Sequence, residues 1–147
     1  MKIVAIASKG GHWVELLRLR KSFEQHEVVY LSTIDDLRNT VAGYKFYSVE
    51  DSSRWNKLRV LTSFISIWRI IFTEKPDVII STGAAPGLLG MLAGRISGAK
   101  TIWIDSIANV DGLSLSGRLA NYFVDKVYTQ WPELSNSKID YAGNILL

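Results

Sequence analysis

The sequence contains no cysteine, which excludes disulfides, thiolate metal sites and cysteine nucleophiles. It also lacks an uncharged apolar run of about 18 residues, the length that a membrane-spanning helix needs. The nearest run, 60–72, is interrupted by Arg69. The apolar run 3–7 is shorter than the apolar core of a signal peptide, which takes about 7–15 residues. With neither a D-x-D motif nor a histidine cluster, the sequence predicts no metal site.

What is present suits one folded domain over residues 1–147. Hydrophobic residues make up 48% of the chain, and the mean hydropathy is +0.12. The net charge of +3 is mildly basic, without the dense Lys/Arg stripe of a nucleic-acid-binding protein. Such an excess suits an anionic membrane surface or a phosphate-bearing substrate, or it serves solubility alone.

Strand-like and helix-like segments alternate along the chain. We expect strands at 2–7, 27–32, 45–49, 77–81, 100–105, 126–129 and 139–142, and helices at 12–25, 55–73, 87–96 and 116–123. Continuous apolar strands joined by helices predict an α/β, Rossmann-like, mostly parallel sheet with helices on both faces. Ligands of such sheets bind beyond the carboxyl ends of the strands, which selects the loops 8–12, 32–36, 81–86 and 105–115.

The first of these loops carries two glycines and a histidine. Gly10 and Gly11 let backbone N–H groups face a phosphate or diphosphate at a helix N-terminus, and Lys9 is a candidate to bind it beside them. Two adjacent glycines do not make the dinucleotide fingerprint or a P-loop, so neither NAD nor ATP is indicated. His12 is a candidate general base or hydrogen-bond donor, or it only caps the helix. Glu15 can orient His12, or it favours the helix N-terminus electrostatically.

Two further loops carry candidate ligands. Thr82, Gly83 and Ala84 have small side chains that expose the backbone to a ligand, or that allow a tight strand-to-helix crossing. Asp105 follows an apolar strand, beside Ser106. Its carboxylate can accept hydrogen bonds from sugar hydroxyls, act as a base, or cap the segment that follows.

The predicted helix 55–73 has an apolar arc about half its circumference wide, broader than the ~100° that a surface helix usually buries. One interpretation is lipid contact through Phe64, Trp68 and Phe72, with Lys57 and Arg59 beside them. The alternative is a helix buried against the sheet and a neighbouring helix. Both hold if one edge packs on the sheet while the other stays free.

Several motifs together resemble a known family. They are G-G-H-x-x-E-x-x-R-L, S-T-G, S-L-S-x-x-G-R-L and Q-W-P-E-L, spread over almost the whole chain. The sequence is similar to the smaller subunit of split UDP-sugar glycosyltransferases. The eukaryotic form anchors the UDP-N-acetylglucosamine transferase of dolichol-linked oligosaccharide synthesis to the membrane, and bacterial relatives serve capsule and exopolysaccharide synthesis.

The resemblance implies the N-terminal, acceptor-binding half of a GT-B glycosyltransferase. The UDP-sugar donor would bind a separate partner subunit, and this chain would hold no cofactor. Its acceptor would be a saccharide on a polyprenyl diphosphate, at the cytoplasmic face of the membrane. The matching positions are Gly10, Gly11, His12, Glu15, Thr82, Gly83 and Ser106, while Trp131, Pro132 and Glu133 match a structural motif. The tail Ile145, Leu146 and Leu147 resembles the family's partner-docking C-terminus.

Two features depart from that family. Relatives more often have Glu at the position of Asp105, and the spanning helix of the eukaryotic form is missing, so attachment would be peripheral. We expect His12 to activate the acceptor hydroxyl, with Asp105 as the competing base. Two alternatives are a non-catalytic membrane adaptor that recruits the transferase and a stand-alone nucleotide-binding Rossmann protein.

Overall fold

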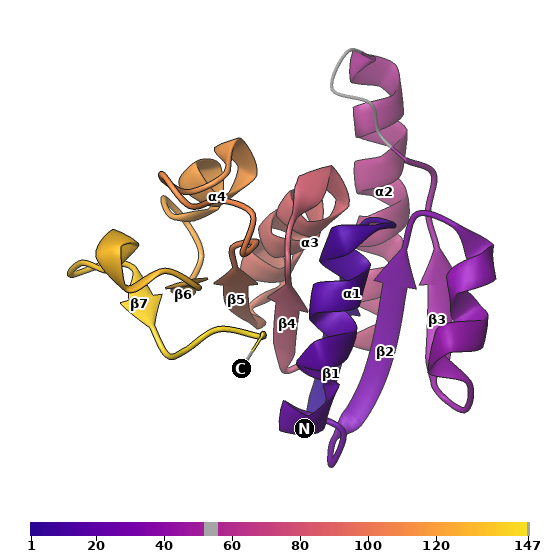
Figure 1. The fold of residues 1–147 in the computed structure, drawn as a ribbon. Helices are drawn as coiled ribbons and strands as arrows, with labels where there is room; N and C mark the ends of the chain where they lie inside the picture. Colours follow the sequence, from indigo (N-terminus) through magenta and orange to yellow (C-terminus); the bar gives the residue numbers. More distant parts are fainter. Residues whose placement is uncertain (52–55, 147) are drawn as a thin grey trace.

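Seven parallel strands form a single sheet in the order β3-β2-β1-β4-β5-β6-β7 (Figure 1). The computed structural model describes residues 1–51 and 56–146. The strands are β1 (Lys2–Ile6), β2 (Glu27–Ser32), β3 (Lys45–Ser48), β4 (Val78–Ser81), β5 (Lys100–Ile104), β6 (Lys126–Thr129) and β7 (Asp140–Tyr141). All six pairings are parallel, which confirms the predicted Rossmann-like class.

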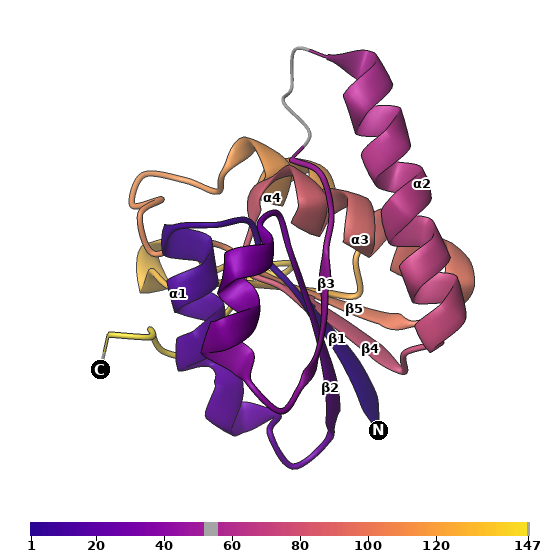
Figure 2. The ribbon, with the colours of Figure 1, turned by 90° about the vertical axis from the view of Figure 1, so that its right-hand side faces the viewer.

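Helices cover the two faces of the sheet in separate groups (Figure 2). On one face lie α2 (Lys57–Glu74), α3 (Ala84–Ser97) and α4 (Leu115–Ala120), and on the other lie α1 (Gly11–Arg18) and the 3-10 turns η1 (Arg20–Ser22) and η2 (Asp35–Val41). A third turn, η3 (Pro132–Leu134), follows β6. Alternate residues of each strand point to opposite faces of the sheet, and they pack into two hydrophobic cores, one on each face. Val4 and Ile6 pack with the α2–α3 side, and Ile3 and Ala5 pack with the α1 side.

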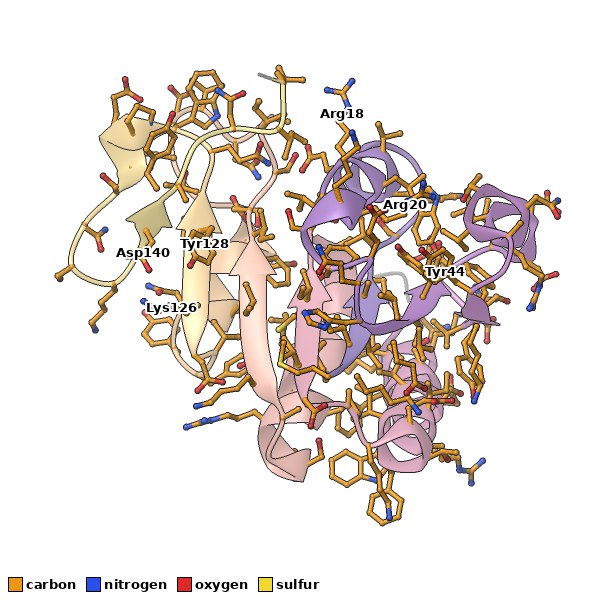
Figure 3. The ribbon with its side chains drawn as sticks, turned by 90° about the horizontal axis from the view of Figure 1, so that it is seen from below. Arg18, Arg20, Tyr44, Lys126, Tyr128 and Asp140 are labelled. Atoms are coloured by element: carbon orange, nitrogen blue, oxygen red, sulfur yellow. The ribbon has the colours of Figure 1, made fainter. Side chains whose placement is uncertain are left out.

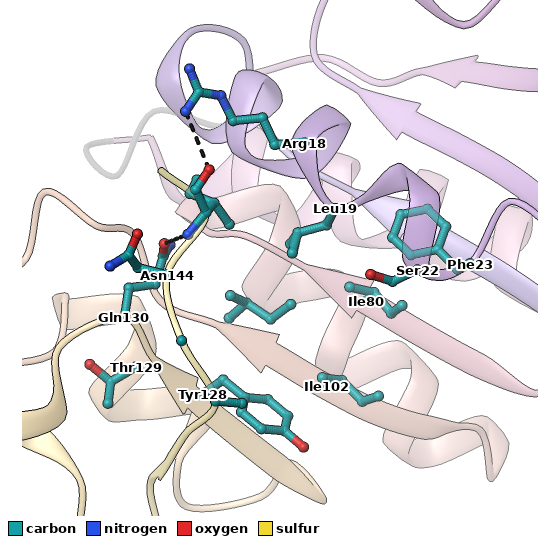
Figure 4. A pocket seen from close by; sticks show the side chains of 14 residues that line it. Arg18, Leu19, Ser22, Phe23, Ile80, Ile102, Tyr128, Thr129, Gln130 and Asn144 are labelled. Atoms are coloured by element: carbon teal, nitrogen blue, oxygen red, sulfur yellow. Dashed lines mark hydrogen bonds between the residues drawn. The ribbon is translucent and has the colours of Figure 1, made fainter. Parts of the chain in front are cut away.

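The α1 face is only partly covered. Beyond α1, the strand residues Ile102, Ile104 and Tyr128 are half-buried, whereas Trp103 and Val127 on the opposite face are buried beneath helices. Seen from below, Arg18 of α1 and Tyr128 of β6 lie on either side of this opening (Figure 3). It forms a cavity of about 540 Å³ with an apolar floor and the tail segment 142–145 along one side (Figure 4).

Helix boundaries differ from the predictions in every helix, and α4 ends at Ala120 rather than at Phe123. α1 ends at Arg18 rather than Gln25, because the chain tightens into η1 and buries Phe23 from a turn. α3 begins at Ala84 rather than Gly87, since Pro86 in the first turn has no N–H to lose there. α2 begins at Lys57, with Asn56 capping the amides of Leu58 and Arg59, and residue 55 lies outside the described part of the chain.

Helix α2 packs along a narrow stripe and leaves an apolar edge free. Ser63, Ile67, Ile71 and Glu74 are buried, and the Ser63 hydroxyl donates to the Glu50 carbonyl. Opposite, Leu58, Leu61, Ile65 and Phe72 are exposed, Phe72 by 63%. Phe64 and Trp68 are partly buried against the core. The helix therefore has one edge packed and the other free, and contact of the free edge with lipid stays a prediction.

Candidate functional site

The predicted loops 8–12 and 81–86 meet where the strand order reverses. β1 and β4 are neighbours, with Ile6 beside Ser81, although 75 residues separate these two positions in the chain. At this switch point a parallel sheet opens a crevice beyond the carboxyl ends of its strands. The loop 8–12 and the loop 81–86 therefore lie side by side.

Two reciprocal hydrogen bonds join these loops. The Thr82 hydroxyl donates to the His12 carbonyl at 2.6 Å, and His12 Nδ1 lies 2.9 Å from the Thr82 carbonyl oxygen. A carbonyl oxygen can only accept, so Nδ1 carries the proton of the neutral ring and Nε2 keeps its lone pair. The bond also fixes the ring's orientation. His12, which is half-buried, thus has the tautomer that a general base needs.

Gly83 makes room for the imidazole. A Cβ built at this position would lie 2.6 Å from both Cε1 and Nδ1 of His12, and the φ of +138° is one that L residues rarely adopt. The next residue, Ala84, has φ of 66°, in the left-handed region. Close contact and a strained backbone therefore coincide at the loop that positions His12.

Two helices begin at this crevice without a side-chain cap. Gly10, with φ of 85°, precedes α1, and Gly83 precedes α3. In α1 the Trp13 amide donates to the Gly10 carbonyl, but the two amides before it, like those that open α3, precede the intrahelical bonds, so both N-termini offer donors and positive potential to an anion. Lys9 is exposed beside them, and its own amide donates to Thr33 Oγ1 at 3.2 Å. The pair can hold a phosphate or diphosphate.

Glu15 turns away from His12. It is 7% exposed, and its two carboxylate oxygens accept from Ser106 Oγ at 2.7 Å and Gln130 Nε2 at 3.3 Å. The Ser106 hydroxyl also accepts from the Ala108 amide. The prediction that Glu15 orients His12 by a hydrogen bond is therefore corrected, because Thr82 does so. Glu15 and Ser106 are buried and hydrogen-bonded to each other, so they organise the loop, and direct contact of either with the acceptor stays a prediction.

Asp105 is enclosed in a network of its own. Its carboxylate is 2% exposed and accepts from Trp103 Nε1, Asn109 Nδ2, the Ser114 amide and the Ser114 hydroxyl, at 2.6–3.0 Å. It also lies against Gly117 of α4. A carboxylate with four donors is poorly placed to take a further proton from a substrate. These contacts favour the capping alternative for Asp105 over the interpretation as a base.

Other predicted residues lie away from the crevice. Lys57, Arg59, Phe64, Trp68 and Phe72 belong to α2, across the sheet from α1. In the tail, Ile145 contacts Arg18 and Gln130 through its backbone. Leu146 is exposed, and Leu147 lies outside the described residues. The Trp131 indole donates to the Ile107 carbonyl at 2.8 Å, as a structural motif would.

The residue that sequence reasoning missed is Gln130. It is 3% exposed at the end of β6, and its side-chain amide joins Glu15, the Asp105 carbonyl and the Ile145 amide. The available signal was a lone amide side chain at the end of an apolar strand, a place where burial demands partners. Its partners come from distant parts of the chain, so the sequence could not identify them.

Within residues 1–51 and 56–146, no three His, Asp or Glu side chains gather closely enough to hold a metal ion. None of the helices described by the structure is both long enough and apolar enough to cross a bilayer.

Comparison with solved structures concerns the fold. MurG of Acinetobacter baumannii superimposes with a TM-score of 0.79 at 18% identity, over 97% of this chain and 46% of the MurG chain. The chain therefore spans less than half the length of that protein. This match confirms the Rossmann-like fold, which the chain shares with part of that protein.

Comparison with known sequences concerns the family. The UDP-N-acetylglucosamine transferase subunit ALG14 of Mus musculus is 26% identical over 181 residues, covering 99% of this chain and 83% of the mouse protein. The UDP-N-acetylglucosamine--N-acetylmuramyl-(pentapeptide) pyrophosphoryl-undecaprenol N-acetylglucosamine transferase of Crocosphaera subtropica is 25% identical over 115 residues, covering 71% of this chain and 33% of that protein. A family model described as "Oligosaccharide biosynthesis protein Alg14 like" matches residues 44–145. This protein belongs to the Alg14-like family of oligosaccharide biosynthesis proteins.

Proposed function

We propose that this chain is the acceptor-binding subunit of a two-subunit glycosyltransferase. The enzyme would transfer N-acetylglucosamine from its UDP-sugar to a saccharide on a polyprenyl diphosphate. The names of its relatives support this donor and a lipid diphosphate acceptor. The observation that carries the proposal is His12, held by Thr82 between two helix N-termini at the switch point of the sheet.

The geometry suggests how the subunit contributes to transfer. The amides that open α1 and α3, with the Lys9 ammonium nearby, bind the diphosphate of the acceptor. His12 Nε2 accepts the proton of the acceptor hydroxyl as its oxygen attacks the anomeric carbon of the donor sugar and UDP departs. The Thr82 carbonyl stabilises the imidazolium that forms, because it accepts from Nδ1–H.

The uncovered half of the α1 face is the proposed site of the donor-binding subunit. Parallel sheets are normally covered on both faces. In this protein Ile102, Ile104 and Tyr128 instead form the floor of an open cavity. We propose that an apolar element of the partner lies on this floor, beside the tail residue Ile145.

Membrane attachment is proposed through the free edge of α2. Its apolar residues Leu58, Leu61, Ile65, Trp68 and Phe72 recur at spacings of three and four, so they share one side of the helix. Ile96 of α3 extends this surface, because it lines one hollow with Ile65 and Trp68 and another with Trp68 and Phe72. Basic residues flank it at Lys57, Arg69 and Lys75.

This surface suits peripheral attachment at the cytoplasmic face. An interfacial helix buries such an edge at the headgroup boundary. The first half of α2 rises beyond the carboxyl ends of the strands, toward the side of the crevice (Figure 1). A lipid-borne acceptor could therefore reach His12 while its chain stays in the bilayer.

A transfer assay tests the proposed reaction. The chain is co-purified with its partner from native membranes, then supplied with UDP-N-acetylglucosamine and a polyprenyl-diphosphate saccharide. The pair should transfer the sugar, and the isolated chain should not. His12→Ala should slow transfer by the pair at least ~100-fold, as expected for loss of a general base. His26→Ala, at the chain's other histidine, is the matched control and should leave the rate unchanged.

The same assay separates the alternatives. Unchanged transfer with His12→Ala, in a pair that still assembles, would favour the non-catalytic adaptor. Nucleotide binding by the isolated chain, without any partner, would favour the stand-alone Rossmann protein.

Vesicle flotation tests the attachment surface. Leu61→Glu, at a side chain that is 55% exposed, should reduce recovery on vesicles containing anionic phospholipid about tenfold. Ser66→Glu adds the same charge on the exposed polar side of α2 and should have a much smaller effect. Equal losses for the two variants would assign the attraction to net charge instead of to this apolar edge.

A further inference from the structure

The side chain of Gln130 links three parts of the chain that are distant in sequence. Its Nε2 donates to Glu15 Oε2 at 3.3 Å and to the Asp105 carbonyl at 3.0 Å. Its Oε1 accepts from the Ile145 amide at 3.1 Å. Since Gln130 is 3% exposed, water cannot readily replace these partners. The residue therefore ties α1, the end of β5 and the tail together.

A second contact also joins α1 to the tail. Arg18 Nη1, at the last residue of α1, donates to the Ile145 carbonyl at 3.4 Å, so α1 is tied to the amide and the carbonyl of one tail residue (Figure 4). Glu15 lies three residues after His12, one turn along the same helix. Displacing the tail would remove a partner of Gln130, and Gln130 holds the helix that carries His12.

We infer that Gln130 is a positioning residue that couples the seating of the C-terminal tail to the placement of His12. With the tail seated, Gln130 is held by Ile145 and directs its amide hydrogens toward Glu15 and Asp105. With the tail displaced, Gln130 can turn, and buried Glu15 keeps only the Ser106 hydroxyl as a donor. The catalytic part of this inference rests on the proposed function, whereas the mechanical part does not.

The tail borders the cavity proposed for the partner, so binding of the partner could act on His12 through the tail and Gln130. Ala142, Gly143, Asn144 and Ile145 line one side of that cavity, and Arg18 and Gln130 line it too. A partner that presses the tail into place would lock α1. Assembly would then order the acceptor site as it brings the donor.

Hydrogen exchange on the isolated full-length chain tests the coupling without any enzyme assay. Ile145→Pro removes the N–H that Gln130 accepts, and Leu146→Pro removes an N–H that bonds only within the tail, to Asn144. Ile145→Pro should speed exchange of the α1 amides about tenfold, and Leu146→Pro should leave it unchanged. Ile145→Ala keeps the N–H and should also leave it unchanged. Equal α1 exchange in the two proline variants overturns the inference.

A charge variant gives a readout that loss of packing would not mimic. Gln130→Glu places a carboxylate against Glu15 and the Asp105 backbone carbonyl, and Arg18 lines the same cavity. Two adjacent carboxylates cannot both stay ionised at low cost, so the pair takes up a proton as the pH falls. Exchange of α1, corrected for its intrinsic pH dependence, should be faster than wild type at neutral pH and recover toward pH 5. Gln25→Glu, at the chain's other glutamine, is exposed and should show no such recovery.

Transfer by the assembled pair then separates the two proposals. If wild-type pairs transfer sugar, Gln130→Glu should reduce kcat at neutral pH and regain it at lower pH, with KM for the donor unchanged. If exchange shows the coupling but no pair transfers sugar, the proposed function fails and the coupling stands. A flat pH profile of α1 exchange in Gln130→Glu contradicts the coupling whatever the transfer assay gives.

Discussion

The two ends of the strands treat their polar groups in opposite ways. At the amino end, buried Glu74 pairs with Lys2 at 2.8 Å and with Lys45, and accepts from the Tyr47 hydroxyl. The start of β5 is also held by a carboxylate, because Asp125 accepts hydrogen bonds from the Thr101 amide and hydroxyl. At the carboxyl end, between β1 and β4, two helices begin uncapped and Ala84 is held at positive φ.

The difference separates stability from function within one sheet. Groups that already have partners hold the strands together but have little capacity left for a ligand. Backbone amides without partners, and a histidine with a free Nε2, can bind and react. We therefore expect changes at the amino end to alter stability alone, and changes at the carboxyl end to alter acceptor binding and transfer.

Removing Glu74 should have the largest effect on stability. Glu74→Ala leaves Lys2 and Lys45 without their shared partner and empties a buried site, so the free energy of unfolding should fall by about 3 kcal/mol. Urea unfolding of the variant and the wild type measures this loss of unfolding free energy. The folded variant, in its pair, should transfer sugar at the wild-type rate. A specific loss of transfer would break the separation between the two ends.

Acid should weaken the same cluster. Burial would raise the pKa of Glu74, but hydrogen bonds from Lys2, Lys45 and Tyr47 outweigh it and lower that pKa from 4.5 to about 2. Its contribution is therefore fully present above about pH 4.5 and is lost as the pH falls toward 2. Glu74→Gln should flatten the decline of unfolding free energy across this window. Parallel curves for variant and wild type would contradict the assignment.

At the carboxyl end, Gly83→Ala should reduce activity more than stability. The added methyl group meets the His12 ring, so transfer by the pair should fall about 30-fold, equivalent to about 2 kcal/mol. Gly43→Ala is the matched control, because Gly43 has φ of +88° and no atom within 4 Å of an added Cβ. Both variants should lose about 1 kcal/mol of stability. Equal transfer rates would show that His12 does not depend on this contact.

The smallest effect should come from relieving left-handed strain at each end. Lys75 ends α2 with φ of 48°, and Ala84 opens α3 with φ of 66°. Replacing either with Gly should raise the unfolding free energy by roughly 0.5–1 kcal/mol. Ala84→Gly should also lower transfer severalfold because the loop beside His12 loosens, whereas Lys75→Gly should not. Identical transfer by the two variants would remove any role for strain at the site.

The sequence predicted the fold more closely than its turns. The strands at 27–32 and 126–129 match β2 and β6, because apolar and β-branched runs specify buried parallel strands directly. The turn η2 was missed, since the polar residues Asp35 and Asp36 gave no periodic signal. The end of α1 was misplaced because Phe23 keeps helical spacing while it packs from a turn.

The candidate site was only partly predictable. The loops around His12 and Gly83 followed from the rule that ligands bind beyond parallel strands. The role of Asp105 did not, because its main partner, Ser114, lies nine residues later in a loop without a periodic pattern. Gln130 was missed for the same reason, as only the folded sheet brings it to Glu15 and Ile145.

Amide chemical-shift mapping tests the central claim most directly. The isotope-labelled full-length chain is titrated with a short-chain, water-soluble prenyl diphosphate that carries N-acetylglucosamine. The account predicts the largest shifts at the amides of Gly11, His12, Ala84 and Ala85, at the starts of α1 and α3, and none at Lys2 or Thr101. Shifts confined to the amino end of the strands, or no saturable shifts at all, would contradict it.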